Sequence, residues 1–106
     1  MITDLTELPE ITVEGIHLIP ANMQVLIDGQ DVKLTKQSFL LLHALLKMPN
    51  RILTPEIIQD VTYGEPHFTS SAIRWRICSL RKKLGSYGDR LENVLDVGYR
   101  FTQKET

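Results

Sequence analysis

Residues 70–85, SSAIRWRICSLRKKLG, carry the densest set of potentially functional side chains in the chain. Five of them are basic, none is acidic, and the only tryptophan and the only cysteine lie among them. The bases are Arg74, Arg76, Arg81, Lys82 and Lys83. Guanidinium and ammonium groups form charge-assisted hydrogen bonds with phosphate oxygens, so this segment suits a polyanionic partner. A charged helix face that is merely solvated would account for the same bases.

The spacing of apolar residues in this segment predicts a helix with one buried face. At about 100° per residue, Ile77, Leu80 and Leu84 return to the side of Ile73 and predict a core face. The opposite side carries a central strip with a basic edge on each flank. The strip consists of Ser71, Trp75, Cys78 and Lys82 with Ser79 just beyond it, and the edges are Arg74 with Arg81 and Arg76 with Lys83.

Such a helix would fit the major groove of double-stranded DNA. The flanking bases would meet phosphates, while the hydroxyls and Trp75 would meet base edges, a thymine methyl group or sugar. A large exposed aromatic side chain often marks a contact surface, which a merely solvated face does not explain. Two other roles for Trp75 stay open, namely contact with a partner protein and packing against a neighbouring loop or hairpin.

The other reactive side chains show no catalytic or metal-binding pattern. The three histidines and Cys78 lack the spacing of metal ligands, and no catalytic triad, carboxylate pair or glycine-rich phosphate loop occurs. We therefore expect neither an enzyme nor a cofactor. His43 lies in an apolar stretch and is expected to be partly buried and hydrogen-bonded. Cys78 is interpreted either as a small tolerated side chain or as a redox-sensitive thiol.

The composition is that of one globular domain. A chain of 106 residues, 42% of them hydrophobic, suits a single core. The longest apolar run, residues 39–46, is far shorter than the roughly 20 residues that span a bilayer. Residues 1–10 are acidic, lack the pattern of a signal peptide, and are expected to form a partly disordered leader. A single cysteine cannot form an intrachain disulfide, so the cytoplasm is the expected compartment and no membrane contact is expected.

The formal net charge of -1 hides a strong asymmetry. Residues 1–35 hold six acids and only one base, Lys33, and so carry a charge of -5. Residues 70–104 hold eight bases and three acids, and so carry a charge of +5. This division favours a polyanionic partner for the C-terminal half and little non-specific attraction for the whole chain.

The element order predicts an α+β winged helix-turn-helix fold. Short strands with turn residues between them predict an antiparallel sheet within residues 11–34, and Asp28-Gly29 favours a tight hairpin turn. Helix start and stop signals predict three helices within 35–85, and two β-rich runs predict a hairpin, or wing, at 92–103. The helices are expected at about 36–47, 55–62 and 70–84, within one domain that spans 11–103.

Three stretches, VKLTKQSFLLLHALLKMPNRILTPEIIQDV, IRWRICSLRKKLG and VGYRF, resemble the DNA-binding (effector) domain of OmpR/PhoB-type response regulators. The resemblance covers about residues 11–103. It implies a bacterial transcription regulator of a two-component system that binds double-stranded DNA sequence-specifically. The third helix would lie in the major groove and the wing in or near the minor groove. Independently of the resemblance, the alternation of residues along the hairpin predicts that Arg100 faces solvent or phosphate.

The resemblance also implies partners. Regulators of this family bind direct-repeat sites, often as tandem dimers, and the loop between the second and third helices can contact RNA polymerase. That loop spans about 63–69 here and includes Tyr63, Glu65, His67 and Phe68. A receiver domain normally precedes such a module, so the chain is interpreted as an excised domain, a stand-alone regulator or the cytoplasmic part of a ToxR-like membrane regulator.

The wing departs from the family pattern. Leu95 stands where an arginine usually reaches the minor groove, and Asp96 places a negative charge near the expected phosphates. These departures keep a second hypothesis open. In it, the winged helix has weak or lost DNA binding and contacts RNA polymerase or a co-regulator through an apolar patch of Trp75, Cys78 and Leu95.

Overall fold

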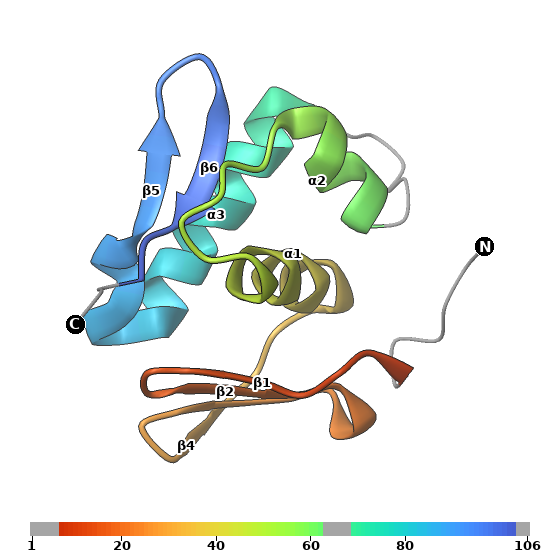
Figure 1. Cartoon of the computed structure of the whole chain (residues 1–106), viewed down its shortest axis with the longest axis vertical. Coiled ribbons are helices and arrows are strands. Elements are labelled where there is room, and N and C mark those ends of the chain that lie inside the picture. Colours follow the sequence, from red (N-terminus) through yellow and green to blue (C-terminus); the bar gives the residue numbers. More distant parts are fainter. Residues whose placement is uncertain (1–6, 63–68, 104–106) are drawn as a thin grey trace.

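A four-stranded antiparallel sheet forms one layer of the molecule, and three helices and a hairpin lie on one side of it (Figure 1). The computed structural model describes residues 7–62 and 69–103. The sheet has the order β1 (Ile11–Val13), β2 (Ile16–Ile19), β3 (Gln24–Ile27) and β4 (Gln30–Val32). Then follow α1 (Lys36–Lys47), α2 (Pro55–Val61), α3 (Ser70–Leu84) and the hairpin β5 (Leu91–Val94) and β6 (Gly98–Phe101). The predicted α+β winged-helix arrangement is confirmed.

The β3–β4 turn shows why local sequence determines the sheet register. Ile27 pairs with Gln30, so only Asp28 and Gly29 make the turn. Both have positive φ, 51° and 86°, as a tight primed hairpin turn requires. The hairpin predicted from Asp28-Gly29 is therefore confirmed.

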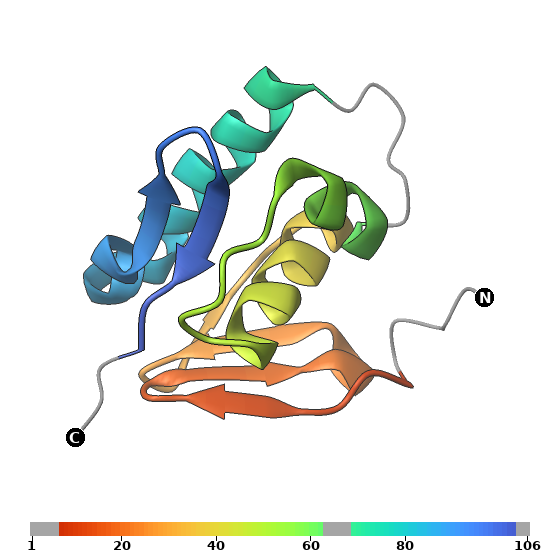
Figure 2. The same cartoon turned by 45° about the horizontal axis from the view of Figure 1, so that its top comes forward.

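Helix α1 is the centre of the core. Every residue from Ser38 to Leu46 is buried, because the sheet covers one side of the helix and α2 and α3 lie over the other (Figure 2). Each fully buried leucine or phenylalanine stabilises the fold by about 1.5–3 kcal/mol. His43 is buried as well, and its Nε2 lies 2.9 Å from the carbonyl oxygen of Pro9. Its predicted hydrogen bond is confirmed, but it is buried more completely than the sequence indicated.

Threonine caps define the starts of all three helices. Thr35, Thr54 and Thr69 each accept a hydrogen bond from a backbone N–H of the first turn. Helix α3 ends at Leu84, because the next residue, Gly85, has a φ of 59°, which an α-helix does not allow. A short 3₁₀ helix, η3 (Gly85–Arg90), follows without a break. The sequence did not predict it, and β5 begins one residue earlier than expected.

The hairpin is attached to the segment between α1 and α2. Leu53 and Tyr99 exchange two backbone hydrogen bonds, of 2.7 and 3.0 Å, so this segment acts as a third strand beside β6. A Cβ atom at Gly98 would lie 2.2 Å from the carbonyl oxygen of Leu53, which explains why this position is glycine. Phe101 is fully buried. The Gly-Tyr-Arg-Phe run thus anchors the wing to the core.

Two polar contacts connect η3 to the turns of the N-terminal sheet. The Tyr87 hydroxyl donates to Asp28 at 2.6 Å, which raises the pKa of Tyr87, and Arg90 forms an ion pair with Glu14. These contacts fix the end of α3 relative to the sheet. Within residues 7–62 and 69–103, no helix is long and apolar enough to cross a membrane.

Candidate functional site

Helix α3 has the two faces that its sequence predicted. Ile73, Ile77, Leu80 and Leu84 are buried and hold the helix against the rest of the core. Ser71, Trp75, Cys78 and Lys82 are exposed, and Ser79 is half-buried. Trp75 is the important case, because 70% of its surface is exposed and it therefore contributes little to the core.

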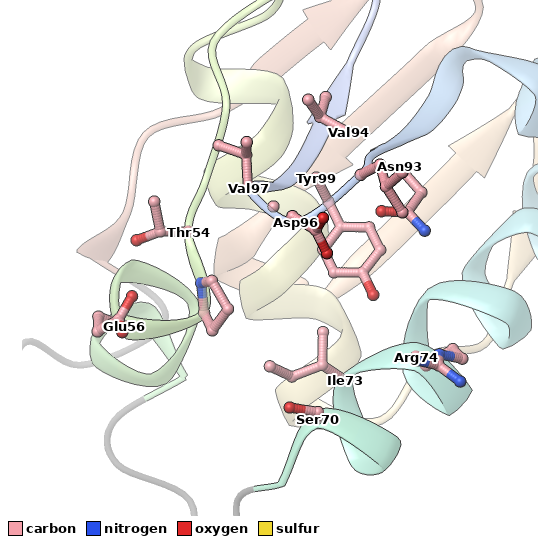
Figure 3. A pocket seen from close by; sticks show the side chains of 13 residues that line it. Thr54, Glu56, Ser70, Ile73, Arg74, Asn93, Val94, Asp96, Val97 and Tyr99 are labelled. Carbon is pink, nitrogen blue, oxygen red and sulfur yellow. The ribbon is translucent and has the colours of Figure 1, made fainter.

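One edge of α3 lies beside the wing. The Nε of Arg81 donates to the carbonyl oxygen of Leu91 at 2.9 Å, which fixes the guanidinium against the start of β5. Arg74, one α3 turn nearer the N-terminus than Cys78, lines a hollow of about 450 Å³ between the hairpin, α3 and the start of α2. Figure 3 shows the Tyr99 ring in this hollow, pointing from the hairpin toward the first turns of α3.

This wing-side hollow also carries negative charge. Glu56 from α2 and Asp96 from the hairpin turn line it together with Arg74. Asp96 has a φ of 64°, a conformation that aspartate and asparagine adopt more readily than most residues, so the turn itself favours this residue type. Arg100 donates to Glu92 at 2.6 Å on the hairpin. Acidic side chains therefore offset most of the positive charge on and beside the wing.

The other edge of α3 lies beside the segment between β4 and α1. Arg76 and Lys83 line a groove of about 640 Å³ there, and the Nζ of Lys83 donates to the carbonyl oxygen of Lys33 at 2.9 Å. We call this the α1-side groove. Its lining residues are Lys33, Leu34, Thr35, Gln37, Ser38, Trp75, Arg76, Ser79 and Lys83.

The α1-side groove adds residues that the sequence did not predict for the site. Lys33 and Gln37 lie about 40 residues from α3 along the chain, so only the fold brings them together. One signal was present in the sequence. Lys33 is the only base among residues 1–35, and it is the one that meets the basic helix.

The residues expected to contact a polymerase, Tyr63, Glu65, His67 and Phe68, lie outside the described residues. Among the residues that the structure does describe, no group of three or more histidine, cysteine or acidic side chains is arranged to hold a metal ion. The thiol of Cys78 is free and exposed on the strip.

Comparison with known proteins places this geometry in context. Residues 29–101, most of the chain, match the family described as "Transcriptional regulatory protein, C terminal". The response regulator protein PmrA of Pseudomonas aeruginosa is 31% identical over 97 residues, which cover 91% of this chain and 43% of PmrA. The chain thus spans less than half the length of this relative.

Solved structures share the fold along nearly the whole chain. The DNA-binding domain of CpxR from E. coli is 25% identical with a TM-score of 0.79, and the match covers 91% of this chain and 98% of that one. The C-terminal DNA-binding domain of RstA from Klebsiella pneumoniae is 27% identical with a TM-score of 0.72, and the match covers 92% and 93%.

Proposed function

Because the chain belongs to the family of C-terminal domains of transcriptional regulatory proteins, we propose that it binds double-stranded DNA sequence-specifically, with α3 in the major groove. The observation that carries this proposal is the exposed face of α3. Trp75, 70% exposed, lies in the middle of a strip of polar and basic side chains that is opposite the buried face. Similarity to the DNA-binding domains of CpxR and RstA supports the same function.

The dimensions of α3 suit this role. Its 15 residues make a helix about 22 Å long. The major groove of B-DNA is about 12 Å wide and admits an α-helix with its side chains. With α3 in the groove, the hairpin β5–β6 would lie beside it, next to the adjacent minor groove.

The proposed roles divide the exposed side chains into two sets. Ser71, Trp75, Cys78 and Ser79 would face base edges, where hydroxyls donate or accept hydrogen bonds and the indole packs on a thymine methyl group or sugar. The basic residues Arg74, Arg76, Arg81, Lys82 and Arg100 would face phosphates. Arg74 and Lys82 form no ion pair with any side chain in residues 7–62 and 69–103. Arg74 shares the wing-side hollow with Glu56 and Asp96, so Lys82 is the better prepared of the two for this role.

In vitro selection from a random duplex library tests the proposal. A domain that binds as proposed enriches a short motif, and binding to that motif weakens steeply as salt rises because phosphate contacts release counterions. Mobility shifts with the selected and a random duplex at two salt concentrations give the specificity ratio. The absence of salt-sensitive binding to any duplex would refute DNA binding by this chain.

One observation favours a second candidate function, contact with another protein through the wing. Leu95 and Val97, at the tip of the hairpin, are 78% and 46% exposed and so bring two apolar side chains together at the surface. Amide NMR spectra separate the two functions. Shifts confined to the hairpin on adding RNA polymerase subunits, with none on adding selected DNA, would favour protein contact over DNA binding.

The proposal extends to the compartment, the accompanying domain and the oligomeric state of the regulator. The family and the similarity to the response regulator protein PmrA support a bacterial cytoplasmic regulator. From the resemblance to response regulators, we further propose that a receiver domain accompanies this module. Binding as a tandem dimer would give a selected site with two direct repeats. The spacing of repeats recovered by in vitro selection therefore tests the dimer, and a single half-site would argue for a monomer.

A further inference from the structure

We propose that the α1-side groove binds the sugar–phosphate backbone of the DNA seated on α3, so that the domain holds the duplex mainly on the side away from its wing. This inference rests on the proposed function, because it concerns the same DNA. It adds a second contact surface, to which the segment between β4 and α1 contributes Lys33 and the first turn of α1 contributes Gln37.

The charges around α3 differ sharply between its two edges. The α1-side groove is lined by Lys33, Arg76 and Lys83, and within residues 7–62 and 69–103 no carboxylate lines it. The wing-side hollow sets Arg74 against Glu56 and Asp96. A phosphodiester strand is therefore attracted to the first edge and is partly repelled at the second.

The positive charge of the groove is not offset by partners of its lysines. Lys83 donates to a neutral carbonyl group, which orients the ammonium without neutralising it. Lys33 lies 3.4 Å from Asp31, but its side chain is 90% exposed, so this ion pair is weak and a phosphate competes with it readily.

The groove is also ordered before DNA arrives. The hydrogen bond from Lys83 to the backbone of Lys33 joins the last turn of α3 to the segment before α1, across 50 residues of sequence. The cap of Thr35 on Ser38 fixes the next residues. Binding therefore needs little further ordering of the backbone, which lowers its entropic cost.

Trp75 and Ser79 favour DNA over an acidic protein as the occupant. Both belong to the face of α3 proposed to enter the major groove, and both line the α1-side groove. A duplex that occupies the first surface reaches the second in the same binding event. The exposed indole offers an apolar surface to deoxyribose, and the hydroxyl of Ser79 and the amide of Gln37 are neutral donors to phosphate.

Salt dependence tests this proposal on the full chain. Lys33→Gln removes one charge from the groove, and Lys47→Gln, the matched control, removes one from the opposite, exposed end of α1. The slope of log K against log salt is negative, and we expect Lys33→Gln to reduce its magnitude by about one. The variant should also weaken binding about three- to tenfold, on the selected and the random duplex alike. Lys83→Gln should act in the same direction, and Lys47→Gln should leave the slope unchanged.

Single methylphosphonate substitutions then identify the phosphates involved. A neutral linkage that weakens binding of the unaltered chain should have little effect on Lys33→Gln, because the contact is already lost. Equal slopes for Lys33→Gln and Lys47→Gln would overturn the groove proposal while leaving DNA binding intact. Undetectable binding of the unaltered chain would instead refute the proposed function itself. Poly-glutamate that displaces the selected duplex from the unaltered chain but not from Lys33→Gln would show that the groove takes acidic protein instead.

Discussion

Trp75 has a large apolar side chain that contributes little to the packing of the core. The residue is 70% exposed, so Trp75→Ala should leave the free energy of unfolding nearly unchanged. If the indole contacts bases, the variant should lose about tenfold or more in affinity for the selected duplex and much less for a random one. Competition mobility shifts measure both losses. Equal losses on the two duplexes would mean that Trp75 contacts only backbone or sugar.

His43 is a residue whose environment predicts a pH effect on stability. Burial disfavours the imidazolium and lowers the pKa of His43 from its ordinary value of 6.5, although the hydrogen bond to Pro9 works against this. The unfolded chain then binds a proton more readily than the folded one. The free energy of unfolding should therefore fall as the pH drops below about 6.5, until the pH reaches the lower pKa of the folded state.

Urea unfolding between pH 7.5 and 5 measures this effect. His43→Gln, which keeps a side-chain donor for the Pro9 carbonyl, should flatten the dependence on pH in that range. His17→Gln, at a partly exposed histidine beside Glu10, is the control and should leave most of it in place. If the free energy of unfolding of His43→Gln still depended on pH as it does in the unaltered chain, the effect would come from other titratable groups.

At the scale of elements, the attachment of the wing depends on Gly98. Any side chain there meets the backbone of Leu53, so Gly98→Ala should separate β6 from the segment before α2 and destabilise the domain by about 1–3 kcal/mol. The control is Gly29→Asn, where φ is 86° and no atom lies within 4 Å of an added Cβ, so the loss should be smaller. Chemical denaturation compares the two. A Gly98→Ala variant as stable as the control would contradict a tight wing contact.

The elements predicted best were those specified by neighbouring residues. The starts of α1, α2 and α3 follow from Thr35, Thr54 and Thr69, because an N-cap acts on the backbone only two or three residues away. The 3₁₀ helix η3 was missed, since its position depends on contacts of Tyr87 and Arg90 with distant turns of the sheet.

The same distinction between local and distant contacts applies to the candidate site. Periodicity alone placed Trp75 and Lys82 on the exposed face of α3, because the angle between residues of one helix is fixed. It did not reveal that Arg81 binds the backbone of Leu91 or that Lys33 lies beside Lys83. Those neighbours come from other parts of the chain, and only the packed structure determines them.

At the scale of the whole molecule, the separation of charge should suppress non-specific DNA binding in a way that depends on salt. The described domain extends 33 Å along its longest axis. The screening length is about 30 Å at 0.01 M salt and about 8 Å at 0.15 M. Acids of the N-terminal half therefore repel a duplex on α3 only at low salt.

A double variant tests this long-range effect. Glu7→Gln and Glu10→Gln together remove two exposed acids, neither of which lines the α1-side groove. The affinity for random duplex should rise severalfold at 0.01 M salt and change little at 0.15 M. Fluorescence anisotropy at both concentrations measures it. An equal gain at both would indicate that these acids lie close to the bound DNA.

The two faces of α3 bear on how such a domain can be retargeted. Four buried residues, Ile73, Ile77, Leu80 and Leu84, attach the helix to the core, and the exposed positions between them carry little of the packing. Different residues of one short helix thus determine which DNA is bound and whether the domain folds. A library randomised at Ser71, Trp75, Cys78 and Lys82 should yield mostly folded proteins, from which new DNA preferences can be selected without rebuilding the scaffold.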